Sequence, residues 1–255
     1  MEGTAVSKRK WKLPAMSLLL FLVLLADGAL AGTVFAIARH QSGTFQSSTI
    51  QASTAQPRQV ALTFDDGPHQ TCTPALLDGL KQRGVKATFF LMGENIAGKE
   101  LLVQRMQEEG HLIGNHSYRH IQMTKEEAEQ ACAEIEQTET LIQDITGRRP
   151  EYLRPPYGAW NEQLECRVNL TTVLWNVDSL DWKLQNTEQI VRRVEKDVKN
   201  GDIILMHDLY GTSADAAVVL IPELKKRGYQ LVTVSEMASL RGGMTPGQVY
   251  HSFRP

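Results

Sequence analysis

The sequence lacks the glycine motifs, the net charge and the repeats that mark several common classes of protein. Neither G-x-G-x-x-G nor G-x-x-x-x-G-K-[ST] follows the first predicted strand, which argues against a nucleotide-binding domain. The net charge is −2 at pH 7, so no overall electrostatic signal points to nucleic acid as a partner. Nothing in the 255 residues resembles an internal repeat.

Cysteine is also scarce, with only Cys72, Cys132 and Cys166. Their spacings match neither a zinc ribbon nor a redox C-x-x-C motif. In an exported protein, one disulfide with one thiol left over is one arrangement, and three reduced thiols are the other. The sequence does not choose between them.

The N-terminal residues carry the pattern of an export signal. Basic residues between Lys8 and Lys12 precede an apolar run over residues 13–38. We predict that residues 1–38 are either a signal peptide, cleaved near Ala29 and Ala31, or an uncleaved membrane anchor. Both alternatives place the rest of the chain outside the cytoplasm, secreted or anchored to the cell membrane.

The apolar run is followed by a segment of different composition. Residues 39–57 are rich in Ser, Thr and Gln and show no apolar period, which predicts a flexible linker. The whole chain is 42% hydrophobic and 22% charged, which is enough apolar material for one sizeable core. We therefore expect the rest of the chain to form one main domain.

Within the main domain, short apolar segments alternate with amphipathic ones. The apolar segments predict seven strands, at 60–64, 86–93, 111–116, 151–156, 171–177, 202–208 and 229–234. The amphipathic segments predict helices at 73–84, 101–110, 124–147, 187–199 and 214–227. This alternation predicts an α/β fold with a mainly parallel sheet, and about seven strands in this length favour a barrel over an open sheet. Thr124 and Glu127 are spaced as a capping box for the third helix, and Gly147 is placed to end it.

Polar side chains follow five of the predicted strands, at the point where each strand ends. They are Asp65 and Asp66; His116 and His120; Arg154 and Tyr157; Asp178, Asp181 and Trp182; and His207 and Asp208. The carboxyl ends of parallel strands meet at one face of the fold, where active sites are built. We therefore expect these residues to form one site.

The adjacent carboxylates of Asp65 and Asp66 would repel each other unless a cation compensates them. His116 and His120 are four residues apart, so one helical turn would place both imidazoles on one face. Two histidines with one carboxylate leave open positions for water and substrate, as a catalytic zinc requires. Only one aspartate is needed as a ligand, and the other is then free to act as a base.

Five ordered segments resemble the motifs of the polysaccharide deacetylase family, also called the NodB-homology domain or carbohydrate esterase family four. The segments are TFDDGP (63–68), HSYRH (116–120), RPPYG (154–158), DSLDW (178–182) and LMH (205–207). The resemblance covers roughly residues 58–240, which places the main domain there and leaves residues 241–255 as a C-terminal tail. It implies a deformed (β/α) barrel of the NodB type. It also implies a metal-dependent hydrolase that removes N-acetyl groups from sugars, with Zn²⁺ as the expected cofactor and Co²⁺ as another.

The resemblance assigns roles around the metal. By similarity, Asp65 is the catalytic base and Arg154 orients it. Asp66, His116 and His120 bind the metal.

The remaining roles concern the leaving group and the substrate pocket. By similarity, the backbone N–H of Tyr157 helps to hold the oxyanion. Asp181 tunes His207, which acts as the general acid, while Trp182 and Leu205 line the pocket around the acetyl methyl group.

Export favours a cell-wall glycan as substrate, and we expect N-acetylglucosamine in peptidoglycan. Chitin oligomers are the alternative amide substrate, and acetylated xylan is an ester substrate that the same metal centre would serve. A non-catalytic carbohydrate-binding protein should have lost a ligand or the base, and none is missing. A two-carboxylate glycosidase would explain the aspartate pair but not the three histidines.

Overall fold

The computed structural model describes residues 57–160 and 170–255, within a compact unit that spans Thr54–Pro255. The predictions for residues 1–38, for most of the linker and for Cys166 lie outside the described residues. Among the helices that are described, none is long and apolar enough to cross a bilayer.

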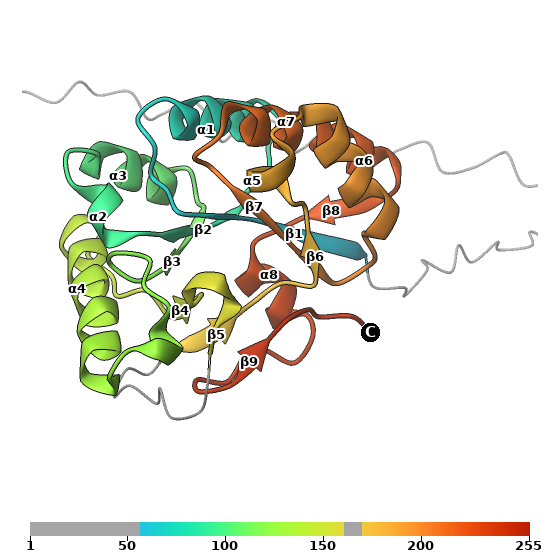
Figure 1. The fold of residues 1–255 in the computed structure, drawn as a ribbon. Coiled ribbons are helices and arrows are strands. Elements are labelled where there is room, and N and C mark those ends of the chain that lie inside the picture. Colours follow the sequence, from blue (N-terminus) through green and yellow to red (C-terminus); the bar gives the residue numbers. More distant parts are fainter. Residues whose placement is uncertain (1–56, 161–169) are drawn as a thin grey trace, which may run out of the picture. The chain divides into compact units, whose positions relative to one another are not determined.

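A single sheet of nine strands organises the domain, and every strand pair in it is parallel (Figure 1). The strand order is β6-β7-β1-β2-β3-β4-β5-β9, and β8 pairs with the first residues of β1. The strands are β1 (Arg58–Asp65), β2 (Thr88–Leu91), β3 (Leu112–Asn115), β4 (Tyr152–Leu153), β5 (Thr171–Val173), β6 (Val177–Asp178), β7 (Asp202–His207), β8 (Tyr229–Leu231) and β9 (Val249–Tyr250). The predicted deformed (β/α) barrel is confirmed.

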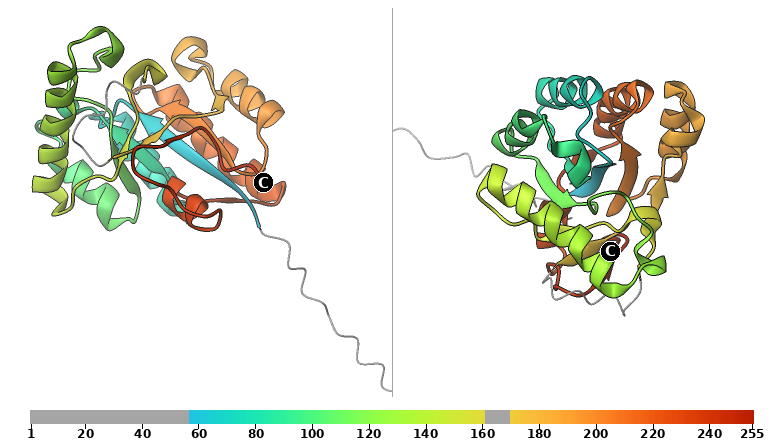
Figure 2. Two further views of the ribbon diagram at one scale, coloured as in Figure 1. Left: turned by 90° about the horizontal axis from the view of Figure 1, so that it is seen from below. Right: turned by 60° about the vertical axis from the view of Figure 1, so that its left-hand side comes forward.

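Five longer helices pack around the outside of the sheet (Figures 1 and 2). They are α1 (Cys72–Gln82), α3 (Glu100–Glu108), α4 (Ala128–Thr146), α6 (Thr187–Asp197) and α7 (Gly211–Lys226). The shorter helices are α2 (Gly93–Ile96), α5 (Asp181–Leu184) and α8 (Val234–Ser239), with 3₁₀ turns η1 (Met123–Lys125) and η2 (Pro156–Gly158). The five predicted helices are confirmed, and the short ones were not predicted, because a single turn has too little periodicity to detect.

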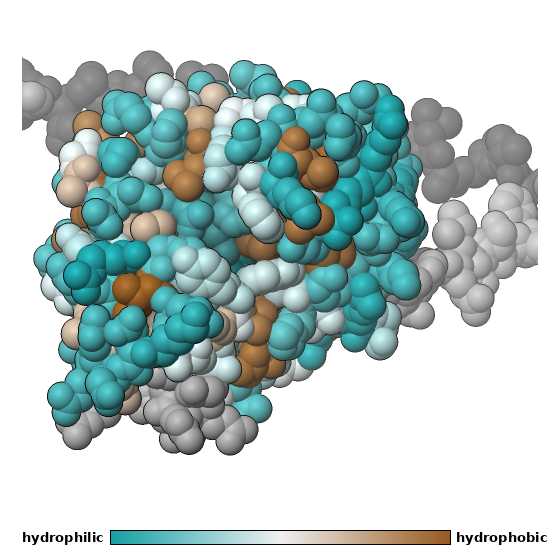
Figure 3. All heavy atoms as spheres, viewed as in Figure 1, coloured by the Kyte–Doolittle hydropathy of each residue, from teal (hydrophilic) through white to brown (hydrophobic). Residues whose placement is uncertain are grey.

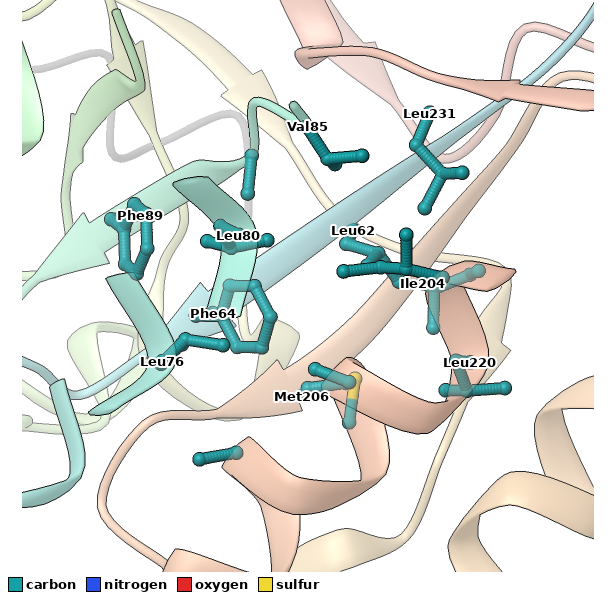
Figure 4. Close-up of a cluster of buried hydrophobic side chains, with 14 of the residues drawn as sticks. Leu62, Phe64, Leu76, Leu80, Val85, Phe89, Ile204, Met206, Leu220 and Leu231 are labelled. Carbon is teal, nitrogen blue, oxygen red and sulfur yellow. The ribbon is translucent and has the colours of Figure 1, made fainter. Parts of the chain in front are cut away.

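The side chains of the strands alternate between the two faces of the sheet and so contribute to two separate hydrophobic clusters. Leu62 and Phe64 of β1 face outward and pack with residues of α1 and α7 in the larger cluster, which is drawn in Figure 4. Ala61 faces inward and belongs to a second cluster, which includes Phe90 and residues of α8. Because side chains of a strand alternate between its faces, Asp65 at the end of β1 also points inward. The outer surface seen in Figure 3 is largely hydrophilic, with small and separate hydrophobic areas.

The segment 171–177 was predicted as one strand, and this prediction is wrong. It forms β5 and β6, which lie far apart in the strand order. The chain leaves the sheet after β5, where the guanidinium of Arg154 donates hydrogen bonds to the carbonyls of Val173 and Leu174. It rejoins the sheet where Asn176 N–H donates to the carbonyl of Ile203 in β7.

The C-terminal residues, predicted as a tail, join the sheet. They add β9 beside β5, and Ser252 forms an antiparallel bridge with Asp202 at the start of β7. Phe253 is buried in the inner cluster. The C-terminal segment therefore contacts both β5 and β7, which lie on opposite sides of the gap that forms where the chain leaves the sheet after β5.

The predicted capping box of α4 is wrong. The helix begins at Ala128, and its N-cap residue Glu127 makes no side-chain capping hydrogen bond, while Thr124 lies in η1. The predicted end at Gly147 is confirmed by a left-handed φ of 72°. A true capping box begins α8, between Thr233 and Glu236.

Candidate active site and metal centre

The carboxyl ends of the strands bring the predicted polar residues to one end of the barrel. In the parallel register of β1 and β7, Asp65 lies opposite His207. His116 follows β3, and its N–H donates to the carbonyl of Leu91 at the end of β2. Arg154 follows β4, and its N–H donates to the carbonyl of Asn115.

Asp66, His116 and His120 form a cluster whose ligand atoms all lie within 4.8 Å of one another. Asp66 Oδ1 is 3.3 Å from His116 Nε2 and 3.5 Å from His120 Nε2. This Oδ1 atom is buried and has no hydrogen-bond partner among the described residues. Burial opposes ionisation of Asp66, but the neighbouring histidines outweigh it and lower the pKa of its carboxyl group.

His116 is held in the orientation of a metal ligand. The residue is 2% exposed, and its Nδ1 lies 2.5 Å from the carbonyl oxygen of Arg154. A carbonyl only accepts, so Nδ1 carries a proton, and Nε2, which faces Asp66, is the nitrogen that can bind a metal. The arrangement therefore fits a divalent cation, which would supply the partner that Asp66 Oδ1 lacks.

The segment 116–120 does not form the helical turn that was predicted. Ser117 and His120 adopt positive φ angles of 63° and 58°, which no right-handed helix contains. The two imidazoles nevertheless come together, with ring centroids 5.1 Å apart. Ser117 Oγ accepts a hydrogen bond from His120 N–H and fixes this turn.

Backbone strain is concentrated at the same place. Positive φ angles also occur at Asp66 (71°), Tyr157 (61°) and Leu180 (52°). The first two are predicted site residues, and Leu180 directly precedes a third, Asp181. Such conformations cost roughly 1–3 kcal/mol each and persist where the surrounding structure over-determines them. The local geometry of the site is thus maintained by the rest of the fold.

Arg154 links the Asp66–His116–His120 cluster to the carboxylate of Asp65. Its side chain is completely buried, and Nη1 donates to Asp65 Oδ1 at 2.8 Å and to Thr63 Oγ1 at 2.7 Å. The guanidinium also lies over the ring of Phe90, 4.2 Å from the centroid. Asp65 Oδ2 faces His116 Nε2 at 3.8 Å. Asp65 is therefore held by one oxygen, and its other oxygen faces the cluster.

Asp181 and His207 form a second buried pair. Asp181 accepts hydrogen bonds from His207 N–H at 2.7 Å and, through its other oxygen, from His207 Nδ1 at 2.8 Å. Burial disfavours the charged imidazole, but Asp181 outweighs this and raises the pKa of His207 to about 9. Burial likewise opposes ionisation of Asp181, and His207 lowers the pKa of this carboxyl. The imidazole is thus protonated near neutral pH and presents its Nε2 proton.

The three predicted pocket residues differ in exposure. Tyr157 is 67% exposed, and its ring contacts that of His120 edge-on, with centroids 4.7 Å apart. Trp182 is 48% exposed at the start of α5, whereas Leu205 is buried in β7 opposite Thr63.

Asp208 is a buried residue beside the site, and the sequence analysis assigns it no role. It follows His207, and its Oδ2 accepts a hydrogen bond from Thr73 Oγ1 at 2.5 Å. Thr73 Oγ1 in turn accepts from His69 N–H at 2.7 Å. A Cβ on Gly67 would lie 2.3 Å from Asp208 Oδ1, so only glycine fits there. Burial raises the pKa of Asp208 to about 7. Its position directly after a strand-end histidine was the only signal in the sequence.

Comparisons with known proteins identify the family. The family model for polysaccharide deacetylase matches residues 52–172. The peptidoglycan-N-acetylglucosamine deacetylase PgdA of Listeria monocytogenes is 41% identical over 71% of the chain and 39% of its own length. The peptidoglycan-N-acetylmuramic acid deacetylase PdaC of Bacillus subtilis is 42% identical over 74% of the chain and 41% of its own length. The chain thus spans about two fifths of the length of these relatives.

Solved structures agree in fold. The structure of PdaC matches with a TM-score of 0.71 and 41% identity, over 73% of this chain and 92% of that one. A family 4 acetyl xylan esterase from Clostridium thermocellum, in complex with a cobalt ion, matches with a TM-score of 0.72 and 34% identity, over 76% of this chain and 98% of that one.

Proposed function

Because the chain belongs to the polysaccharide deacetylase family, we propose that it is a metal-dependent hydrolase that removes N-acetyl groups from N-acetylglucosamine residues of peptidoglycan. The observation that carries the proposal is the joint arrangement of three groups at one end of the barrel. These are the Asp66–His116–His120 cluster, the Asp65–Arg154 pair and the Asp181–His207 pair. Together they supply a metal site, a base and an acid.

When bound by Asp66, His116 and His120, a divalent cation supplies Lewis acidity that activates water and polarises the acetyl carbonyl. Zn²⁺ suits this ligand set, and Co²⁺ accepts the same ligands. The cobalt ion in the related acetyl xylan esterase supports this choice.

The protein's own groups move the protons. Asp65, oriented by Arg154, takes a proton from the attacking water. The backbone N–H of Tyr157 donates to the developing oxyanion, a contact of a kind worth roughly 3–4 kcal/mol. His207 gives its Nε2 proton to the departing nitrogen, since an amine anion is too poor a leaving group. Water and the amide thus become acetate and a free amine on the sugar.

The substrate assignment is supported by PgdA and by the predicted export of the chain. The name of PdaC adds N-acetylmuramic acid as a second sugar within the same polymer. Chitin oligosaccharides and acetylated xylan are the alternatives, and the esterase neighbour supports the latter. We further propose that residues 13–38 hold the protein at a membrane, with the site outside the cytoplasm.

The test is acetate release by the full chain, stripped with chelator and then given Zn²⁺ or Co²⁺. The substrates are N-acetylglucosamine oligomers, peptidoglycan and acetylated xylan. We expect release that depends on metal and is fastest on peptidoglycan. Faster release from xylan would make the protein an esterase, and no release from any substrate with metal bound would indicate a binding protein.

A further inference from the structure

Four cations gather at the opposite end of the barrel from the site, where the strands begin. Arg58 starts β1, and Arg227 follows α7; both guanidinium groups lie over the ring of Tyr229, at 4.1 and 5.6 Å from its centroid. Arg58 Nη1 also donates to the carbonyl of Arg227. Lys225 Nζ donates to the carbonyl of Arg83, which ends α1. We call Arg58, Arg83, Lys225 and Arg227 the basic cluster.

None of these four cations is paired with a carboxylate among the described residues. Their donors contact backbone carbonyls or the Tyr229 hydroxyl instead. Neighbouring cations do have acidic partners, as Lys81 does in Glu109 and Lys226 in Glu223. Helix dipoles favour cations at the ends of α1 and α7, but Arg58 begins a strand and gains nothing from them. Within the described residues, the cluster is therefore a group of four cations that form no ion pair with a carboxylate.

The cluster also lies where the chain enters the domain. Arg58 is the first residue of β1, and the predicted linker (39–57) and the apolar run (13–38) precede it. An open groove beside the cluster is lined by Gly84, Lys225 and residues 228–232. The carboxylates of the candidate site occupy the other end of the strands.

We propose that the basic cluster docks on the anionic lipid surface of the membrane that holds residues 13–38, so that the deacetylase site faces away from it. The inference rests on the proposed membrane anchoring but not on the deacetylase chemistry. Each cation near an anionic bilayer is worth about a fivefold gain in binding, and the effect falls off within a Debye length. Contact should therefore need anionic lipid and low salt.

The experiment uses the full chain reconstituted in nanodiscs of phosphatidylcholine, with or without about 30% phosphatidylglycerol. The rate of acylation of Lys225 by a water-soluble reagent is followed by mass spectrometry. The exposed residues Lys125 in η1 and Lys183 in α5 are internal controls outside the basic cluster. We expect Lys225 to react at least about fivefold more slowly on anionic nanodiscs, with the control lysines unchanged and the difference lost at high salt.

Two variants test the cluster directly. Arg58→Gln/Arg83→Gln should abolish the protection of Lys225, and the matched change Arg148→Gln/Arg192→Gln at exposed arginines outside the cluster should preserve it. Equal rates for Lys225 on both lipids would overturn the proposal, as would equal protection of all three lysines. Loss of protection in millimolar inorganic phosphate at constant ionic strength would also overturn it, in favour of a discrete anion site. Acetate release from soluble oligomers, measured on the same samples, reports separately on the proposed function.

Discussion

Asp65 and Asp66 are adjacent in the sequence but have different surroundings in the structure. Asp65 receives a hydrogen bond from the buried guanidinium of Arg154 and is 2% exposed. Asp66, with its positive φ, turns its unpaired Oδ1 toward His116 and His120. The change of backbone conformation between the two residues is what divides the proposed base from the proposed ligand.

Substitution of these residues should separate chemistry from metal binding. Asp65→Asn keeps the size and the contact with Arg154 but cannot accept the proton, so turnover should fall about 10²–10⁴-fold. Metal content, measured by atomic emission, should be unchanged, whereas His116→Ala should lose the metal as well as the activity. An Asp65→Asn variant with full activity would show that Asp65 is not the base.

The pairing of Asp181 with His207 makes a prediction about pH. A general acid must be protonated, so turnover should fall as pH rises through the His207 pKa of about 9. Asp181→Asn removes the strongest of the interactions that raise this pKa and leaves the smaller effects of Asp65 and Asp66 against the opposing effect of burial. The high-pH limb of kcat against pH should then move toward or below 6.5, the ordinary value for histidine.

The control for this prediction is Asp178→Asn. Asp178 is a nearby carboxylate that accepts a hydrogen bond from Leu180 N–H rather than from His207. Its substitution should leave the high-pH limb in place. Equal loss of rate at every pH in the Asp181 variant would indicate a purely structural role.

At the scale of elements, the strands and long helices were predictable because each repeats a period over several residues. The site was predictable because its residues follow strand ends, and parallel strands deliver their ends to one place. The turn at 116–120 was not, because the positive φ of Ser117 and His120 is imposed by tertiary contacts rather than by local propensity. The division of segment 171–177 into two strands was not predictable either, because the chain leaves the sheet where Arg154, from another part of the sequence, donates hydrogen bonds to its carbonyls.

The connection into β7 has a glycine that the structure requires. Gly201 has a φ of +90°, and an added Cβ would lie 2.2 Å from the carbonyl oxygen of Phe253. Gly201→Ala should therefore lower the free energy of unfolding by at least about 2 kcal/mol. Gly147→Ala is the control, because its φ is +72° but no atom lies within 4 Å of the new Cβ. It should cost only about 1–2 kcal/mol, and urea unfolding measures both. Equal losses would show that backbone strain, not the contact with Phe253, sets the requirement.

At the scale of the whole molecule, the C-terminal residues complete the barrel. Phe253 is 6% exposed in the inner cluster, and Arg254 pairs with the buried Asp202 at 2.6 Å. Phe253→Ala should lower the free energy of unfolding by about 3 kcal/mol through loss of buried contacts. Val249→Ala, at a side chain in β9 that is 39% exposed, should cost less than about 1 kcal/mol. A small effect of Phe253→Ala on the urea midpoint would mean that the segment only lies on the barrel.

The same segment brings the two ends of the domain together. Gly201 N–H donates to the carbonyl of Gln59 at 2.7 Å, and Phe253 N–H donates to the carbonyl of Gly201 at 2.7 Å. The first and last residues of the domain therefore lie close together, at the end of the barrel away from the site. A domain whose termini lie close together tolerates insertion into a longer protein and circular permutation at an exposed loop. Neither change would pass a linker across the site. This geometry suits a domain whose matches cover only 39% and 41% of the length of PgdA and PdaC.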